Sequence, residues 1–198
     1  MEELRSKKYD VRRKWGCRLV IPFFIANFAA IMKEVTIKDD VLRKAAGEGM
    51  DAFVGAFVQA IKETIGGELT AATLGELNSD QITLLAWDVL HEEVMDGGFV
   101  QLIHNGYGPF IFKNPFAKAV KLWGMRELSK LVYDAHTLYV KYHEPLEKDC
   151  TDDEFMALFE QFPEFDDMDD EFVEKEEEWT EQIARYIDEN IDRFAIVK

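Results

Sequence analysis

Residues 166–194 read DDMDDEFVEKEEEWTEQIARYIDENIDRF, and this stretch decides the fold. Its apolar residues recur at intervals of four, seven, four, four, four and three. Such spacing places side chains on one face of an α-helix, so the stretch predicts a long amphipathic helix that packs on a core. The apolar stripe consists of Met168, Phe172, Trp179, Ile183, Ile187, Ile191 and Phe194.

Helical spacing extends over most of the chain before this stretch. The apolar residues predict one helix over residues 41–65, ended by Gly66-Gly67, and another over residues 125–142. A further apolar face runs from residue 82 to residue 94, and Gly97-Gly98 interrupts or ends that helix. Only residues 110–112 and 195–197 resemble strands.

Two capping boxes support the helical interpretation. Asn78 with Gln81, and Thr151 with Glu154, have the spacing in which a cap side chain and a third-position side chain satisfy each other's backbone N–H groups. We therefore expect an all-α fold, a single-domain multi-helix bundle with one or two very short strands at most.

Length and composition favour one folded domain of 198 residues, since hydrophobic residues make up 47% of the chain. We expect residues 36–198 to form the helical domain with the acidic C-terminal helix. Residues 1–35 are expected to form a basic and apolar N-terminal extension packed on the core. Within it, residues 19–32 are too short for a membrane span, and their flanks do not fit a signal peptide, so they predict a core segment.

The two cysteines, Cys17 and Cys150, fit no CxxC pattern. Reduced thiols in a cytoplasmic protein are the simpler interpretation.

Charge is distributed unevenly along the chain. The formal net charge is -16, composed of +5 over residues 1–44, -7 over residues 45–150 and -14 over residues 151–198. An acidic surplus of this size repels nucleic acid and anionic lipid and attracts basic partners, although solubility alone also accounts for it. We expect a basic protein as partner, and neither direct nucleic-acid binding nor membrane binding.

The polar side of the last helix is almost entirely acidic over residues 166–181, where only Lys175 opposes ten carboxylates. Nine net charges on about 22 Å of helix give about one charge per 2.5 Å, against roughly 1.7 Å for duplex DNA. Like charges four residues apart destabilise a helix, so a face needed only for solvation would include more lysines. The predicted partner-binding surface comprises Asp166, Asp167, Asp169, Asp170, Glu171, Glu174, Glu177, Glu178 and Glu181.

The double glycine in the middle of the chain lies within a second distinctive segment. Gly97-Gly98 permits positive φ or close helix approach, and Phe99 would then enter the core. A chain break leaves backbone groups unpaired, so we expect Gln101 and Asn105 to satisfy them in a structural role.

This segment, with Glu93, Asp96, Gly97, Gly98, Phe99, Gln101 and Asn105, resembles the signature of a bacterial helical domain family first catalogued as being of unknown function. The resemblance covers approximately residues 36–198. One member of that family is a DNA mimic, a dimer that binds a transcription factor in DNA's place. The resemblance therefore implies an interaction role, with a homodimer as one expectation, although a shared fold does not fix function.

The enzyme interpretation finds little support in the sequence. Asp88 and His91 have the spacing of a carboxylate–imidazole metal pair, but a di-iron bundle needs a second copy. Neither a GxSxG elbow nor a GxxxxGK[ST] phosphate loop occurs. We expect no catalytic residues, no metal and no cofactor.

Three hypotheses follow from these observations. The first is a DNA mimic that occupies the nucleic-acid site of a basic DNA-binding protein or transcription factor. The second is an immunity-type protein that neutralises a basic toxin or nuclease. The third is a small-molecule-binding protein or enzyme that uses a pocket at Gly97-Gly98.

Overall fold

The computed structural model describes residues 32–198. The expectations for the apolar segment 19–32, the basic extension and Cys17 therefore lie almost wholly outside the described residues. In chain order the described elements are β1 (Thr36–Ile37), α2 (Asp39–Glu48), α3 (Met50–Thr64), α4 (Ala71–Leu74), α5 (Ser79–His104), α6 (Gly108–Phe112), α7 (Phe116–Leu122), α8 (Arg126–Leu146), α9 (Asp152–Gln161), the 3-10 helix η2 (Pro163–Phe165), α10 (Asp166–Glu189), α11 (Ile191–Phe194) and β2 (Ile196–Val197). The all-α prediction is confirmed.

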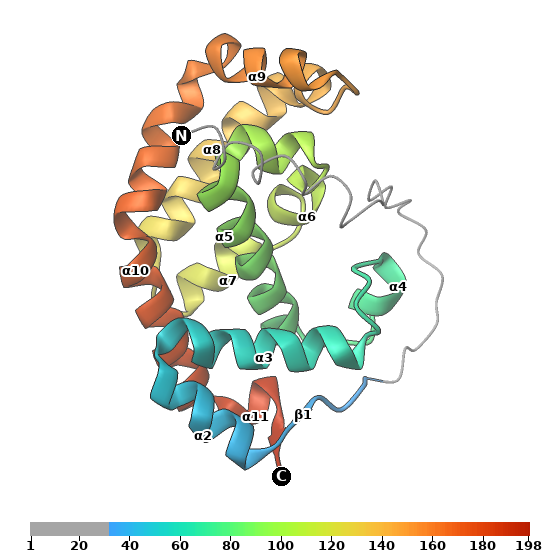
Figure 1. Ribbon diagram of the computed structural model, residues 1–198, viewed down its shortest axis with the longest axis vertical. Helices are drawn as coiled ribbons and strands as arrows, with labels where there is room; N and C mark the ends of the chain where they lie inside the picture. The colour runs from blue at the N-terminus through green and yellow to red at the C-terminus, as the bar shows by residue number, and fades with distance from the viewer. Residues whose placement is uncertain (1–31) are drawn as a thin grey trace.

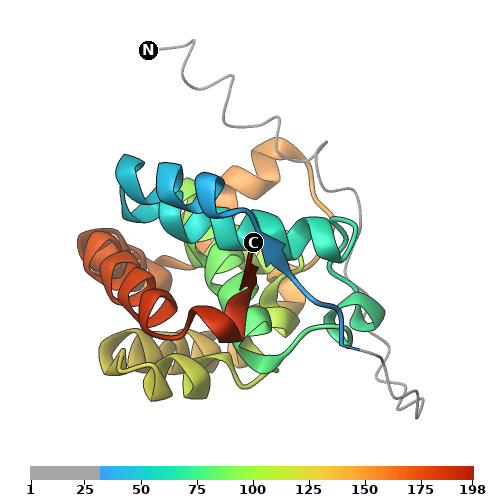
Figure 2. The same cartoon turned by 90° about the horizontal axis from the view of Figure 1, so that it is seen from below.

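The helices pack around α5, which runs through the middle of the molecule (Figure 1). Helix α10 lies along one side of α5, α8 packs on another, and α3 crosses near its first turns (Figures 1 and 2). Because α5 is enclosed in this way, apolar residues on several of its sides are buried, including Leu84, Leu90 and Phe99 with no exposed surface. An enclosed helix of this kind forms the centre of a single core.

Aromatic residues connect α5 to α10 within that core. The Phe172 ring lies 5.9 Å from Trp87 and 5.4 Å from Trp179, measured between ring centroids. Phe172 is fully buried, and Trp179 is 1% exposed. The apolar stripe that predicted α10 is therefore the surface by which this helix packs on the core.

Both capping boxes form as predicted. Asn78 Oδ1 accepts a hydrogen bond from Gln81 N–H at 2.9 Å, and Gln81 Oε1 accepts one from Asn78 N–H at 3.0 Å. The same two side chains donate to the carbonyls of Arg193 and Phe194, at 2.7 and 2.9 Å. The start of α5 is thereby joined to the end of α11.

Three predicted elements are corrected by the structure. The helix expected over residues 41–65 is two helices, because Gly49 has φ of 127° and separates α2 from α3. The long C-terminal helix ends at Glu189, and the last two residues of its stripe belong to α11. Residues 110–112 are helical, within α6.

The two strands form one short parallel pair, in which Thr36 aligns with Ile196 and Ile37 with Val197. This pair brings the chain near residue 36 to the C-terminus (Figure 2). Across residues 32–198, no helix combines the length and the apolar character that crossing a membrane requires.

Candidate functional site

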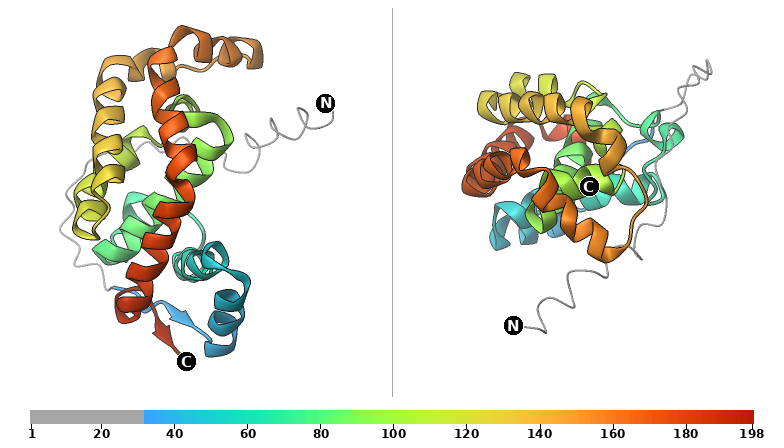
Figure 3. Two further views of the ribbon diagram at one scale, coloured as in Figure 1. Left: turned by 90° about the vertical axis from the view of Figure 1, so that its left-hand side faces the viewer. Right: turned by 90° about the horizontal axis from the view of Figure 1, so that it is seen from above.

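Helix α10 presents one long side to solvent. In the left view of Figure 3 it lies at the front of the molecule, with α8 on one side, α3 on the other and α5 behind it. Its inner side is filled by the buried residues Phe172, Trp179, Ile183 and Ile187. The polar residues between them therefore face outward.

Most of the predicted acidic surface is exposed along this side. We name this group the α10 acidic face, defined as Asp166, Asp167, Asp170, Glu171, Glu174, Glu177 and Glu178. These seven exposed carboxylates lie within twelve helical steps, which span about 18 Å. The result is about one charge per 2.6 Å, so the comparison with duplex DNA at roughly 1.7 Å persists after buried residues are removed.

Asp169 departs from the expectation that it belongs to the exposed surface. Its Oδ1 atom accepts a hydrogen bond from Phe99 N–H at 2.8 Å, and its side chain is partly buried against Gly98. Burial raises the pKa of Asp169 to about 7, and the carboxylates of Asp166 and Asp170 add to the rise, whereas the hydrogen bond from Phe99 lowers it. Asp169 therefore acts as a cap for the second half of α5 rather than as part of the outer surface.

Glu181 is also less available than the sequence suggests. Arg185 Nη2 lies 2.6 Å from Glu181 Oε1, an i,i+4 ion pair on the surface of α10. One turn nearer the N-terminus, Glu176 turns toward α5 and contacts His91 Nε2 at 2.7 Å.

Lys175, the cation within the acidic stretch, is paired as well. Its Nζ atom donates to Glu127 Oε2 of α8 at 2.6 Å, and this hydrogen bond lowers the pKa of Glu127. Because Lys175 is directed to a carboxylate on another helix, the α10 acidic face keeps its negative charge.

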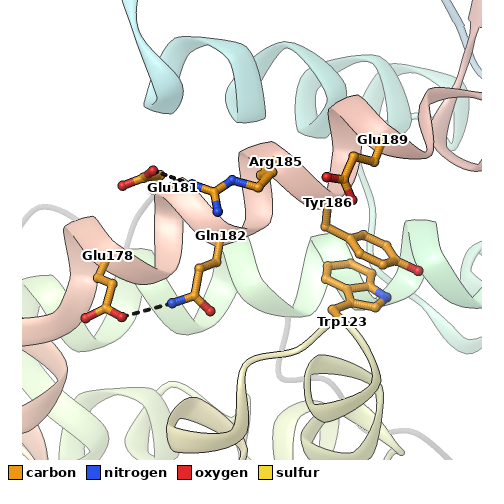
Figure 4. A pocket seen from close by; sticks show the side chains of 7 residues that line it. All are labelled: Trp123, Glu178, Glu181, Gln182, Arg185, Tyr186 and Glu189. Carbon is orange, nitrogen blue, oxygen red and sulfur yellow. Dashed lines mark hydrogen bonds and ion pairs between the residues drawn. The ribbon is translucent and has the colours of Figure 1, made fainter.

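An open pocket of about 380 Å³ lies where α10 passes the end of α7 (Figure 4). Tyr186 stacks on Trp123 with ring centroids 4.5 Å apart and planes at 17°. The Trp123 indole N–H donates to Asp80 at 3.1 Å. The remaining lining residues are polar: Glu178, Glu181, Gln182, Arg185 and Glu189. This pocket was not predicted from the sequence, because Trp123 and Tyr186 are far apart in the chain and meet only in the fold.

The family-signature residues form an internal polar cluster. Gly97 and Gly98 have non-helical backbone angles, and Gly98 has φ of 71°. The space beside them is filled, since a Cβ on Gly97 would lie 2.2 Å from Gln101 and one on Gly98 would lie 2.2 Å from Asp169. The structural role predicted for the double glycine agrees with this geometry, whereas a ligand pocket directly at the glycines does not.

The partners of Gln101 and Asn105 differ from the expectation. The Gln101 amide donates to Glu93 at 3.2 Å and to Asp96 at 3.0 Å, and the Asn105 amide donates to Glu93 at 2.7 Å. These side chains thus bind carboxylates, while the freed backbone N–H of Phe99 is bound by Asp169. Desolvation raises the pKa of Glu93, although both amide hydrogen bonds lower it.

Asp88 and His91, the candidate metal-binding pair, contact two different residues and not each other's site. Asp88 lies 2.6 Å from Lys62 Nζ, and His91 contacts Glu176. No group of three or more potential metal-ligating side chains occurs within residues 32–198.

Together these features define the class: an α-helical protein whose longest exposed helix carries closely spaced carboxylates. The chain belongs to the family of DMP19-like proteins, whose model matches residues 75–190. This range includes α5 with its double glycine and all of α10, so the resemblance noted in the sequence is confirmed. The chain is also 32% identical over 165 residues to the DNA mimic protein DMP19 of Neisseria meningitidis serogroup B, across 83% of this chain and 97% of that protein.

Proposed function

We propose that this protein is a non-enzymatic DNA mimic, whose α10 acidic face occupies the nucleic-acid site of a basic DNA-binding protein. The spacing of the exposed carboxylates is the observation that carries the proposal. They approach the charge density of duplex DNA on a helix held rigid by a buried aromatic stripe. A protein groove built for phosphates therefore meets a similar density of negative charge at a similar spacing.

The pocket between α7 and α10 supports the proposal with a second kind of contact. Three glutamates and a single arginine line this pocket, so its charge is negative, and the stacked Trp123–Tyr186 pair forms one wall. Arginine side chains, which contact phosphates in DNA-binding proteins, also pair with carboxylates and stack on aromatic rings. A partner's arginine thus finds both interactions at this end of the α10 acidic face.

The relative's name is consistent with this proposal, since it describes that protein as a DNA mimic. A cytoplasmic location suits a partner that binds chromosomal DNA, and the partner we propose is a transcription factor or another DNA-binding protein. We also propose that the protein acts as a homodimer.

The test is capture of basic proteins from the native lysate on the immobilised full-length protein, followed by a salt gradient and by excess duplex DNA. The variant is Asp170→Asn/Glu174→Gln/Glu177→Gln, which removes three charges from the α10 acidic face. Its matched control is Glu34→Gln/Glu63→Gln/Glu68→Gln, which removes three exposed charges away from α10. Both triple variants have a formal net charge of -13, obtained by removing three carboxylates from a chain of -16.

We expect a DNA-binding protein to be retained by the native chain and the control, released by DNA and lost in the α10 variant. Equal losses in both triple variants would show that net charge alone attracts the partner. A single tight partner that DNA does not displace would instead support the immunity-type hypothesis.

A further inference from the structure

One part of this acidic chain is cationic. Residues 113–130 contain five lysines and arginines and a single acidic residue, Glu127, which is already paired with Lys175. These residues form α7 and the first turns of α8. This local surplus of positive charge contrasts with the net charge of -16 of the whole chain.

Three of these cations surround a pocket of about 510 Å³ at the junction of the two helices. Arg126, Ser129, Lys130 and Tyr133 line it from α8, and their spacing of three, four and seven residues places them on one face of that helix. Lys121 lines it from the last turn of α7.

Ser129 gives this pocket a buried polar group. The residue is only 2% exposed, yet its hydroxyl forms no hydrogen bond within the part of the chain that the structure describes. Its backbone N–H is used by the helix, bonded to Met125 O at 3.1 Å. The hydroxyl is not among the fully enclosed polar atoms that lack a partner, so it reaches the pocket and can bond to a molecule that enters it.

The start of α8 adds a further preference for an anion. This helix has 21 residues, and Met125 at its N-cap provides no side-chain hydrogen bond to the first backbone N–H groups. The Arg126 N–H is bonded to Gly124 O at 3.1 Å, so the preference for an anion comes from the helix dipole together with the nearby Arg126 and Lys121 side chains.

We propose that this pocket binds a phosphate monoester. The phosphate accepts hydrogen bonds from the Ser129 hydroxyl and from the Arg126 guanidinium, whose fork of donors suits two phosphate oxygens. Lys121 balances the remaining charge together with Lys130, whose Nζ atom also lies 3.9 Å from Asp134 Oδ2 in an exposed i,i+4 pair. The organic part of the ligand lies toward Tyr133, which is 51% exposed at the outer end of the pocket.

The experiment is calorimetric titration of the full-length protein with adenosine 5′-monophosphate, with inorganic phosphate and with sulfate, at one fixed ionic strength. We expect saturable binding of one adenosine 5′-monophosphate, weaker binding of inorganic phosphate and weaker binding still of sulfate. Ser129→Ala and Arg126→Gln should each weaken nucleotide binding about tenfold or more, because each removes a hydrogen bond to a charged group. The control Lys44→Gln, which removes a cation from the exposed side of α2, should change it less than about twofold.

Tyr133→Leu separates the two sources of phosphate. It should weaken binding of the nucleotide and leave binding of inorganic phosphate unchanged. Inorganic phosphate that binds as tightly as the nucleotide would overturn the assignment to a monoester.

Ser129→Ala also keeps the test independent of folding. Removing a buried hydroxyl that has no partner should leave the melting temperature unchanged or slightly higher. Absence of saturable heat with both phosphate ligands, or equal binding by Ser129→Ala and the native chain, would show that the pocket is not a phosphate site. The capture experiment with the α10 acidic face should give the same result for Ser129→Ala as for the native chain, so the two proposals fail separately.

Discussion

The carboxylate of Asp169 accepts a hydrogen bond from the backbone N–H of Phe99 at 2.8 Å and so joins the acidic helix to the kink in α5. The two residues lie in the two segments that the sequence singles out, the acidic stretch and the double-glycine signature. Gly98 makes the approach possible, because any Cβ there would lie 2.2 Å from an Asp169 oxygen. The orientation of the α10 acidic face therefore depends on a contact at the centre of the molecule.

Gly98→Ala should be strongly destabilising. The new methyl group would overlap Asp169, and φ of 71° is unfavourable for alanine. We expect the free energy of unfolding to fall by about 2–4 kcal/mol, measured by urea unfolding. The control is Gly47→Ala in α2, where nothing lies within 4 Å of a new Cβ, and it should be neutral or stabilising by up to about 1 kcal/mol. Equal effects of the two substitutions would contradict the close contact.

Asp169→Asn should raise stability at alkaline pH. The pKa of Asp169 in the folded protein, about 7, lies well above the ordinary pKa of an aspartate, so the folded state binds the proton more tightly than the unfolded state. This group's contribution therefore lowers stability as pH rises from about 4 to 7. Asparagine keeps an oxygen for the Phe99 N–H but cannot ionise.

The difference between Asp169→Asn and the native chain should be on the order of 2–4 kcal/mol at pH 8 and should approach zero near pH 4. Urea unfolding of both proteins across this range measures it. A variant that is less stable than the native chain at pH 8 would show that the ionised carboxylate is preferred at this site.

Gln101→Ala should destabilise the polar cluster on the inner side of the kink. The Gln101 amide donates to both Glu93 and Asp96, and Glu93 is only 8% exposed. Loss of a donor to a buried carboxylate typically costs about 1–3 kcal/mol, and urea unfolding should detect it. Gln59→Ala, which removes a comparable amide from the exposed side of α3, should change stability by less than about 0.5 kcal/mol.

Lys175→Gln should affect partner binding more than folding. The Lys175–Glu127 ion pair is exposed, and pairs of this kind contribute little to stability, so the urea midpoint should not change measurably. Removal of the cation leaves the Glu127 carboxylate unpaired beside the α10 acidic face, which adds a negative charge, and the captured partner should elute at a higher salt concentration. Elution at lower salt would indicate that Lys175 itself contacts the partner.

Periodicity and capping chemistry predicted much of the fold. Local spacing is sufficient to identify a helix that packs by one face, and the Asn78 and Thr151 boxes depend only on residues three positions apart. The break at Gly49 was not predicted, because a single glycine is compatible with a continuing helix as well as with its end.

The exposure of individual carboxylates depends on contacts between distant segments. Asp169 turns inward because α5 presents an unpaired N–H beside it, and Glu176 turns inward because His91 lies opposite. Neither partner is visible from the spacing of residues on α10 itself. The pocket at Trp123 and Tyr186 was missed for the same reason, since it exists only where α7 lies beside α10.

The contact between Asp169 and Gly98 also divides α10 into positions with different evolutionary freedom. In any descendant that keeps the double glycine, residue 169 is confined to a short side chain with an oxygen acceptor, because nothing larger fits against the kink. The outward carboxylates of α10 have no such constraint from the core and are free to be gained, lost or shifted. One helix thus holds a fixed anchor beside surface positions whose charges can change without altering the fold.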